Sequence, residues 1–483
     1  MGAAYMLGTS MGKSAVVMFV LVFLIATCIA VTPALSSGGL VENSWESKAP
    51  MSQARKSLGV AVVNGKIYAI GGSTRSGEGS ALTGGAIGTN EEYAPATDTW
   101  APKMPMPTHR KSFAIASYEG KIYCIGGFAS SGGATEVNEV YDPIMDTWET
   151  KTSMPTARAA LKANVMEGKI YLMGGYTPDN SAFGYSISNL VEVYDPATDT
   201  WTTKDPMPTA AANYVSAVVD KKLFIIGGES SVPRSNLNQI YDLNADSWSI
   251  GAPSPSGIRY GACAAGATIG VNAPKRIYVL GEALSLWEGE PANFVRVYNP
   301  DSDSWTFGTD VPTKRQGFGV AVLNDMIYVI GGYTSTYRDV YDWVHGRPQI
   351  TKYATNDQYT PFGYGTTPPI IDVASPVNQT YNASSVSLDF KLNKPAVWMG
   401  YSLDGRDNVT IAGNVTMDGL SNGLHNVTVY ARDELENTGV SETITFTVAV
   451  PFPTAFVAAS TASATIIGAG ILVYFKRLKR QTK

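Results

Sequence analysis

The sequence predicts an all-β fold, with a six-bladed β-propeller followed by a small β-sandwich and one C-terminal transmembrane helix. Three observations support this prediction. A Gly-Gly pair follows a short apolar run at regular intervals, each repeat carries a spaced tyrosine and tryptophan, and a long uncharged segment lies near the C-terminus. Composition agrees, because 48 glycines and 26 tyrosines accompany only 16% charged residues, which favours strands and turns over long solvated helices.

Both ends of the chain carry apolar segments. Lys13 precedes an uncharged run from Ser14 to Leu35 that ends in small residues, which predicts a secretory signal peptide over residues 1–36. An uncleaved anchor helix is the alternative, because the run approaches the length that spans a bilayer. Residues 454–475 are predicted to form a transmembrane helix, and the basic cytoplasmic tail, 476–483, places everything before it outside the cell. The predicted location is the cell membrane, with single-pass type I topology.

The portion between these ends is acidic. Lys13 and five tail residues take six of the 36 basic residues, which leaves 30 basic against 41 acidic residues and a net charge near −11. Nucleic acid is therefore not an expected partner, since no basic stripe is available to collect phosphates. Outside the signal peptide, Cys124 and Cys263 lie in apolar runs of different repeats and are expected to be buried free thiols, although a disulfide between them stays open.

A repeat governs the middle of the chain. The Gly-Gly pair occurs five times, a sixth copy has Glu282 as its second residue, and an aromatic residue stands three positions before each first glycine. The first glycines are 48 to 55 residues apart. They are Gly71, Gly126, Gly174, Gly227, Gly281 and Gly331. A fixed period of this length is typical of arrays and propellers.

A second signature follows each pair. In five repeats a tyrosine precedes a tryptophan by seven residues, and an aspartate lies two residues before that tryptophan. These aspartates are expected to form hairpin turns rather than a calcium site, because one carboxylate per repeat cannot converge on one ion. Each repeat is predicted to be a four-stranded blade, for example with strands at 58–63 and 67–70 joined by an Asn64-Gly65 turn.

The double glycine, the spaced tyrosine and tryptophan, and links such as Met154-Pro155-Thr156-Ala157-Arg158 resemble kelch repeats, as in the central domain of galactose oxidase. The resemblance covers residues 41–345 and implies a six-bladed propeller. Tyr341 of the sixth repeat has no tryptophan seven residues later, whereas the orphan Trp45 precedes the first repeat. We therefore expect an N-terminal strand to close the ring, which would leave no unpaired edge.

Residues 346–369 are rich in proline and glycine and are predicted to be a linker. Alternating runs over residues 370–450 predict a β-sandwich that resembles immunoglobulin-like modules but lacks their cysteine pair. All sequons of the predicted mature chain lie in this module. The predicted glycosylation sites are Asn378, Asn382, Asn408, Asn414 and Asn426. The whole combination resembles archaeal cell-surface proteins, in some of which the C-terminal segment is a processed sorting signal.

No catalytic residue, metal or cofactor is predicted. The copper site implied by the resemblance to galactose oxidase needs two histidines and a cysteine-linked tyrosine, but the chain has only three histidines, one of them in the sandwich. Motifs of zinc proteases, phosphate loops and serine hydrolases are absent from the sequence. A resemblance to kelch propellers that isomerise sialic acids keeps an extracellular sugar isomerase or lyase as the alternative function. A structural envelope protein is the third.

The favoured function is a cell-surface-anchored recognition or adhesion module that binds an extracellular protein or glycan at one mouth of the propeller channel. The links between blades end in arginine in five repeats and in Ala211 in the fourth. Resemblance to kelch adaptor proteins implies that this position and the one directly after Gly-Gly contact acidic peptides. The candidate ligand-binding residues are Arg55, Arg110, Arg158, Arg259, Arg315, Phe128, Tyr176, Glu229 and Tyr333. A structural role for the arginines, bonding loop carbonyls and holding the blades in register, is the alternative.

Overall fold

A computed structural model describes residues 41–75, 85–180, 184–230, 236–255, 264–282, 292–336, 349–451 and Leu472. The predicted signal peptide, the basic tail and all of the predicted transmembrane helix except Leu472 lie outside these residues, as do Arg259 and Cys263. In the part of the chain that is described, no helix has both the length and the apolar character needed to cross a membrane.

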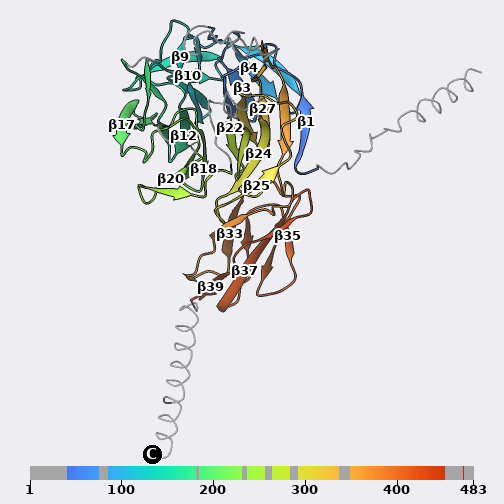
Figure 1. The fold of residues 1–483 in the computed structure, drawn as a ribbon. Helices are drawn as coiled ribbons and strands as arrows, with labels where there is room; N and C mark the ends of the chain where they lie inside the picture. The colour runs from blue at the N-terminus through green and yellow to red at the C-terminus, as the bar shows by residue number, and fades with distance from the viewer. Residues whose placement is uncertain are drawn as a thin grey trace, which may run out of the picture. The chain divides into compact units, whose positions relative to one another are not determined.

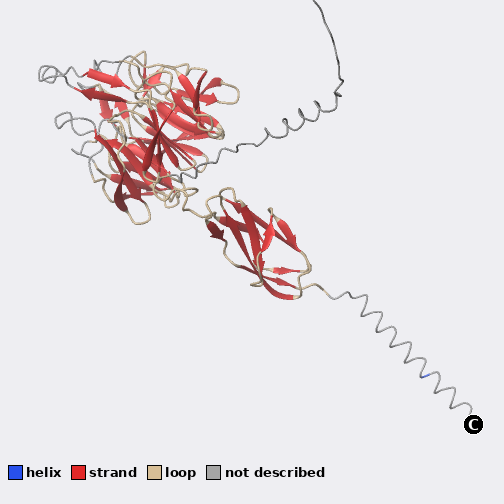
Figure 2. Ribbon diagram, turned by 90° about the vertical axis from the view of Figure 1, so that its right-hand side faces the viewer, coloured by secondary structure: helices blue, strands red, loops and turns tan. Residues whose placement is uncertain are grey.

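The described residues up to Thr360 contain six four-stranded antiparallel sheets (Figures 1 and 2). Sheet 1 contains β2 (Gly59–Val63), β3 (Lys66–Ile70), β4 (Asn90–Ala94) and β5 (Thr99–Lys103). Sheet 2 contains β7 (Ala114–Tyr118), β8 (Lys121–Ile125), β10 (Asn138–Asp142) and β11 (Thr147–Lys151). Sheet 3 contains β12 (Lys162–Met166), β13 (Lys169–Met173), β16 (Val191–Asp195) and β17 (Thr200–Lys204). These bounds confirm the strands expected at 58–63 and 67–70 to within one residue.

Sheet 4 contains β18 (Val215–Val219), β19 (Lys222–Ile226), β20 (Asn238–Asp242) and β21 (Ser247–Gly251). Sheet 5 contains β22 (Ala264–Ala267), β23 (Ile277–Glu282), β24 (Ala292–Asn299) and β25 (Ser304–Gly308). Sheet 6 contains β26 (Gly319–Leu323), β27 (Met326–Ile330), β30 (Asn356–Thr360) and β1 (Ser44–Lys48). The first strand of each sheet packs against that of the next, and β26 packs against β2, so the sheets close into the ring of a β-propeller.

In four of the sheets a tyrosine, an aspartate and a tryptophan latch neighbouring sheets together. In sheet 1, the Asp98 carboxylate accepts hydrogen bonds from the Tyr93 hydroxyl (2.7 Å) and from the Ala49 amide (2.8 Å), and Trp100 Nε1 donates to the Ala49 carbonyl (2.7 Å). Ala49 belongs to the link between β1 of sheet 6 and β2 of sheet 1. The same three contacts recur around Asp146, Asp199 and Asp303. The hairpin role of these aspartates is confirmed, and each also ties one sheet to the one before it.

Residues from both ends of the propeller build the latch that closes the ring. Asn43 replaces the aspartate, and its Oδ1 accepts from the Thr309 amide (2.7 Å) and the Tyr359 hydroxyl (2.6 Å). Trp45 Nε1 donates to the Thr309 carbonyl at 2.8 Å, and β1 pairs with β30. Closure through Trp45 is therefore confirmed.

The predicted end of the propeller at residue 345 needs correction. The third strand of sheet 6 is β30, which falls inside the segment 346–369 expected to be a linker. Tyr359, which is fully buried, takes the place that the spacing had given to Tyr341, a residue outside the described part of the chain. Three short pairs of strands lie outside the six sheets. These are β6 (Arg110–Lys111) with β9 (Phe128–Ala129), β14 (Tyr176–Pro178) with β15 (Tyr185–Ile187), and β28 (Tyr333–Thr336) with β29 (Gln349–Lys352).

Removing the closing tryptophan should weaken the whole ring. We expect Trp45→Ala to lower the free energy of unfolding by about 2 kcal/mol, because the substitution removes the hydrogen bond to Thr309 and the ring packed on Tyr359 at a centroid distance of 4.9 Å. Denaturant unfolding of the full chain measures the change. Trp45→Phe keeps much of the packing and should lose less, whereas equal stability of Trp45→Ala and the unchanged chain would contradict closure by this strand.

The C-terminal β-domain, residues 371–448, has two sheets. One contains β31 (Ile371–Ser375), β33 (Val386–Leu392) and β36 (Val415–Met417). The other contains β32 (Thr380–Tyr381), β39 (Ile444–Val448), β37 (Gly423–Arg432), β34 (Trp398–Leu403), β35 (Val409–Ile411) and β38 (Thr438–Val440). Alternating residues such as Leu388, Val427 and Phe446 form one shared core. The five sequon asparagines are all exposed.

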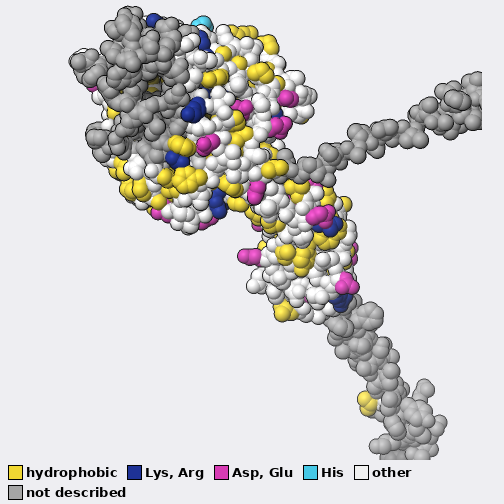
Figure 3. Space-filling model, turned by 45° about the vertical axis from the view of Figure 1, so that its right-hand side comes forward, with side chains coloured by type: hydrophobic (Ala, Val, Ile, Leu, Met, Phe, Trp, Pro, Cys, Tyr) yellow, Lys and Arg dark blue, Asp and Glu magenta, His cyan; other side chains and the backbone are white. Residues whose placement is uncertain are grey.

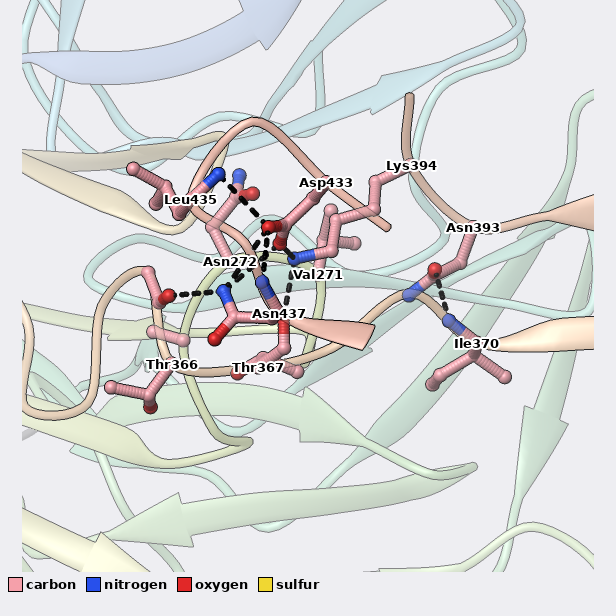
Figure 4. A network of polar contacts seen from close by, with 12 residues as sticks. Val271, Asn272, Thr366, Thr367, Ile370, Asn393, Lys394, Asp433, Leu435 and Asn437 are labelled. Carbon is pink, nitrogen blue, oxygen red and sulfur yellow. Dashed lines mark hydrogen bonds and ion pairs between the residues drawn. The ribbon is translucent and has the colours of Figure 1, made fainter. Parts of the chain in front are cut away.

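A polar network orders the start of the C-terminal β-domain (Figure 4). The buried Lys394 ammonium lies 2.7 Å from the buried Asp433 carboxylate and also donates to the Thr367 carbonyl. Asn437 Nδ2 donates to the Gly365 carbonyl at 2.5 Å, and the Gly365 amide donates to the Asn272 carbonyl at 2.7 Å. The segment before β31 is thus hydrogen-bonded both to the C-terminal β-domain and to the loop that follows β22.

The C-terminal β-domain should lose stability as the pH rises. Both ring nitrogens of the buried His425 face acceptors, the Asp404 carboxylate and the Ser421 carbonyl, each at 2.8 Å, an arrangement that favours the protonated ring. The Ser421 carbonyl and then Asp404 raise the pKa of His425, although burial opposes them. The folded state therefore binds the proton more tightly than the unfolded chain. The stabilisation is complete below about pH 6.5 and disappears as the pH rises through the raised folded pKa.

Unfolding of this domain in the full chain, followed against pH, tests that expectation. His425→Gln cannot titrate and should remove the pH dependence in this window. An unchanged slope in the variant would assign the pH dependence to other groups.

Candidate functional site

A series of four backbone hydrogen bonds joins the links between sheets at one end of the propeller. The amide of Ser57 donates to the carbonyl of Gly317, Ser112 to Ser57, Ala160 to Ser112 and Asn213 to Ala160, at 2.7 to 3.0 Å. All five residues have a positive φ between 51° and 62°, so each link turns sharply at this point. We call these five residues the rim ring, because they connect sheets 6, 1, 2, 3 and 4 in order around the axis.

Pairs of variable residues border the rim ring. The residue before each ring residue forms a β-bridge or a short strand pair with the residue directly after Gly-Gly. These ten rim positions are Lys56 with Ser73, Lys111 with Phe128, Ala159 with Tyr176, Ala212 with Glu229, and Gln316 with Tyr333. The latch residues are nearly the same from repeat to repeat, but the rim positions differ. The scaffold is constant and its rim is not.

The structure corrects the proposed role of four candidate arginines. Arg55, Arg110, Arg158 and Arg315 are 0 to 1% exposed, so none presents its guanidinium to a ligand in solution. Arg110 shows the arrangement, because its Nη1 donates to the carbonyls of Gly126 and Val137 at 2.9 Å and its Nη2 donates to that of Cys124 at 3.1 Å. The alternative interpretation, in which the arginines hold loop carbonyls inside each repeat, accounts for these contacts. Arg259 lies outside the described residues.

Each buried arginine also pairs with a buried carboxylate two residues before the latch tyrosine. The distances are 2.7 Å for Arg55 to Glu91, 2.7 Å for Arg110 to Glu139, 2.6 Å for Arg158 to Glu192, and 2.7 Å for Arg315 to Asp357. Burial lowers the pKa of the Arg158 guanidinium from its ordinary value, and Glu192 opposes that shift.

In sheet 4, where Ala211 replaces the arginine, the matching residue is the neutral Gln239, which bonds both backbone groups of Thr209. The acidic residue is absent where the arginine is absent. In the fifth repeat the matching residue is Arg296 although Arg259 is present in the link, so the arginine and the acidic residue occur together in four repeats.

The candidates after Gly-Gly fall into two groups by environment. Phe128 is 4% exposed and packs edge-on against Tyr185 with ring centroids 5.5 Å apart, so it supports the rim more than it lines it. Tyr176 and Glu229 are partly exposed and hydrogen-bonded to each other, and Asn213 Nδ2 donates to the Glu229 carboxylate at 2.8 Å. The structure therefore brings Tyr176 and Glu229 together beside the rim ring at sheets 3 and 4.

Basic side chains gather on another part of the rim. The Lys56 ammonium lies 4.0 Å from the centroid of the Tyr333 ring, a cation–π contact between sheets 1 and 6. Burial lowers the pKa of the neighbouring Lys111, and the positive charges of Lys56 and Arg75 lower it further. Lys352 Nζ donates to the Thr74 carbonyl at 2.5 Å. Sequence reasoning did not select these four basic residues. It concentrated on the repeated arginine and not on the next residue, which is Lys56 or Lys111 in the first two repeats.

Other classes of site find little support in the described part of the chain. It contains no group of three or more His, Cys, Asp or Glu side chains that could hold a metal ion. Cys124 is a buried free thiol, and burial raises its pKa to about 12. On the described surface that Figure 3 shows, basic and acidic side chains are interspersed and do not form one basic band. This distribution of charge suits contact with a surface that carries both positive and negative side chains.

Comparison with protein-family models finds two matches within the propeller. Residues 112–332 match a model described as "KLHDC2/KLHL20/DRC7 Kelch-repeats domain", and residues 54–107 match the kelch motif. Together with the ring of four-stranded sheets, these matches support a kelch-repeat β-propeller.

Curated relatives match over single stretches of the chain. Kelch-like protein 15 of Mus musculus is 29% identical over 165 residues, which is 31% of this chain and 27% of that protein. Kelch-like protein terF of Aspergillus terreus is 29% identical over 172 residues, 34% of this chain and 36% of that protein. A homologue of the influenza virus NS1A-binding protein from Mus musculus is 40% identical over 78 residues, 16% of this chain and 11% of that protein. The chain thus spans about a third or less of these relatives.

Proposed function

We propose that this kelch-repeat β-propeller is the recognition module of a cell-surface protein and binds a protein partner at its rim. In this proposal the six sheets are the six blades of one propeller. The C-terminal β-domain is an immunoglobulin-like stalk that carries glycans, and residues 454–475 anchor the chain in the membrane. The ligand is an extracellular protein. A glycan attached to that protein contacts the same rim of the propeller.

The observation that carries the proposal is the contrast between scaffold and rim. Tyrosine, aspartate and tryptophan recur at matched positions of the hairpins, and in four repeats a buried arginine pairs with a buried carboxylate, so these residues stabilise the fold. The rim positions instead hold lysine, serine, phenylalanine, alanine, tyrosine, glutamate and glutamine. Repeats that needed only to pack would have no reason to differ at one end. A rim of different side chains on a closed, rigid ring suits recognition of one asymmetric partner.

Two sequence features support the proposed location. The sequons are confined to the C-terminal β-domain, and all five asparagines are exposed, so each is accessible to a glycosylating enzyme. The apolar segment and basic tail after that domain match the pattern of a membrane anchor with its tail in the cytoplasm. Mass spectrometry of the chain from its native source tests the sequons directly.

A binding comparison tests the rim. The full chain and a Lys56→Ala/Tyr176→Ala/Tyr333→Ala variant would be immobilised and exposed to proteins extracted from the cell surface and to a glycan array. The control variant is Ile144→Ser/Met145→Ser, which changes two exposed residues of the β10–β11 hairpin. We expect the unchanged chain and the hairpin control to retain the same protein, and the rim variant to lose it. Retention by the rim variant would overturn the proposed site.

A further inference from the structure

Across four of the six junctions between neighbouring sheets, a lysine accompanies the aspartate of the latch. The lysine ends the outermost strand of one sheet, three residues after the tryptophan, and the aspartate belongs to the next sheet. Between sheets 3 and 4 the Lys204 ammonium lies 3.0 Å from the Asp246 carboxylate. At the other three junctions the aspartate accepts the amide of the residue that follows the lysine. The four pairs are Lys48 with Asp98, Lys103 with Asp146, Lys151 with Asp199, and Lys204 with Asp246.

Glycine replaces this lysine at the two remaining junctions, with different consequences. Between sheets 5 and 6, Gly308 accompanies the neutral Asn43, so the positive and the negative charge are both missing. Between sheets 4 and 5, Gly251 stands in place of the lysine, but Asp303 is retained and accepts the Ala252 amide at 2.6 Å. Asp303 is therefore the one latch aspartate whose junction supplies no lysine.

A cavity of about 330 Å³ opens beside Gly251 at this junction. Its lining includes Asp303, and its apolar walls include Phe224 and Ile240. The other five sheets have a tyrosine at the position of Phe224, so sheet 4 lacks a hydroxyl group as well as a lysine side chain. The cavity thus lies where two side chains are smaller than their counterparts in sheets 1 to 3, and its volume is within the range of ligand sites.

Sheet 1 shows what fills the matching space elsewhere. The Tyr68 hydroxyl donates to the Glu92 carboxylate at 2.7 Å, and the Lys103 ammonium lies 3.1 Å from the same carboxylate. The counterparts of these three residues in sheet 4 are Phe224, Ile240 and Gly251. The polar side chains that fill this space in sheet 1 are thus replaced by apolar walls and a missing side chain.

The charges at the cavity are only partly balanced. Two charged residues of its lining, Asp220 and Lys222, each have a partner of opposite charge. In the part of the chain that the structure describes, no lysine or arginine pairs with Asp301 or Asp303, which also line the cavity. An ammonium group on an apolar stem would meet apolar walls along its length and two carboxylates at its tip.

We propose that this cavity binds the side chain of a lysine from a protein partner, with the methylene stem along Phe224 and Ile240 and the ammonium at Asp301 and Asp303. A lysine is the expected occupant because lysines of the chain itself take the matching position in sheets 1 to 3. Ile250, which is 58% exposed and lines the cavity, offers an apolar contact to the main chain that carries the lysine. None of the lining residues is a rim position, so the inference adds a contact surface beyond the proposed function.

Short peptides test the occupant on the full chain. Each peptide has glycine and serine residues around one central residue, which is lysine, norleucine or glutamate. Saturation-transfer NMR with competition by the lysine peptide ranks their affinities. The lysine peptide should bind about tenfold more tightly than the other two, with the difference shrinking at high salt. Equal binding of the lysine and norleucine peptides would overturn the proposal.

The free amine n-butylammonium distinguishes a protein lysine from a small amine. It should bind more weakly than the lysine peptide, because it has no main chain to contact Ile250. Equal affinities of n-butylammonium and the lysine peptide would assign the cavity to a free amine and contradict the proposed source.

Two variants assign the contact. Asp303→Asn keeps an acceptor oxygen for the Ala252 amide and removes the charge, as Asn43 does beside Gly308, so the fold accommodates it and lysine binding should weaken about tenfold. Gly251→Lys supplies the lysine of the other junctions and should abolish binding. An added Cβ at Gly251 would lie 2.8 Å from the Ile240 side chain, so thermal unfolding of this variant is measured alongside.

The matched control is Asp98→Asn, at a junction that has its own lysine, and it should leave binding of the lysine peptide unchanged. Unchanged affinity in Asp303→Asn would overturn the site. The rim variant Lys56→Ala/Tyr176→Ala/Tyr333→Ala should bind the lysine peptide like the unchanged chain. Loss of the peptide in the rim variant would instead place the lysine at the rim and contradict this inference, while leaving the proposed function intact.

Discussion

Arg110→Ala should lower the free energy of unfolding of the full chain by about 3 to 5 kcal/mol. The guanidinium is buried and joins the Glu139 carboxylate at 2.7 Å to three carbonyls around the second Gly-Gly pair. Removing it leaves a buried, unpaired carboxylate and three carbonyls without this donor, and desolvated charge is costly when its partner is absent. Denaturant unfolding with a linear extrapolation gives the change.

The fourth repeat supplies the control for this prediction. It carries Ala211 and Gln239 where the second repeat carries Arg110 and Glu139, so the double variant Arg110→Ala/Glu139→Gln reproduces a combination that this fold already accommodates. We expect the double variant to be more stable than the single one. A loss below about 1 kcal/mol for the single variant would show that the buried pair is not a structural requirement, and equal loss in both would show that the unpaired carboxylate is not its cause.

Asp325→Ala should have a comparable effect, about 3 kcal/mol or more, at a site that no repeat pattern indicates. The carboxylate is 1% exposed and accepts four backbone amides of the loop after β22. The donors are Ile269 at 2.7 Å, Val271 at 2.9 Å, Asn272 at 2.6 Å and Ala273 at 3.1 Å. Without the carboxylate these four donors lose their acceptor, and the loop keeps the hydrogen bond from Asn272 Nδ2 to the Asn324 carbonyl of the β26–β27 turn.

Thermal and denaturant unfolding measure this loss, and Asp325→Asn serves as the comparison. Asparagine keeps one acceptor oxygen in the same place, so its stability should lie between that of Asp325→Ala and the unchanged chain. Asp301→Ala, at an exposed position in the β24–β25 hairpin, should have little effect. Unchanged stability of Asp325→Ala would mean that the loop is held by other contacts.

Regular features of the fold could be predicted because the same physical requirement recurs in every repeat. Gly-Gly positions have positive φ, and added side-chain atoms there would meet backbone or core atoms, so glycine is required each time. The tyrosine and tryptophan spacing follows from the paired strands that carry them, as in the register of Tyr93 with Trp100. The orphan Trp45 revealed ring closure because one repeat lacked its tryptophan.

Features that depend on a single interaction were harder to predict. Tyr341 matched the tyrosine spacing, but the third strand of sheet 6, β30, carries Tyr359 instead, and an insertion that breaks the period sets its distance along the chain. The repeated arginine was named as a candidate for ligand binding because a guanidinium usually stays in solvent unless it is paired. Its partner, an acidic residue two positions before the tyrosine in four repeats, was not recognised.

The rim itself was only partly predictable. Resemblance to kelch adaptors led to Tyr176, Glu229 and Tyr333, which the structure places beside the rim ring. The lysines one residue after the arginines were missed, because alternation along an extended link turns adjacent side chains to opposite sides. That alternation puts Arg110 into the interior and leaves Lys111 at the rim.

Amide hydrogen exchange of the full chain, with and without a bound partner, tests the central claim most directly. If the rim is the binding surface, the partner should slow exchange in the segments around Ser57, Ser112, Asn213 and Tyr333, and leave the β10–β11 hairpin and the C-terminal β-domain unchanged. Slower exchange confined to the β10–β11 hairpin or to the C-terminal β-domain, with unchanged exchange at the rim, would contradict the account.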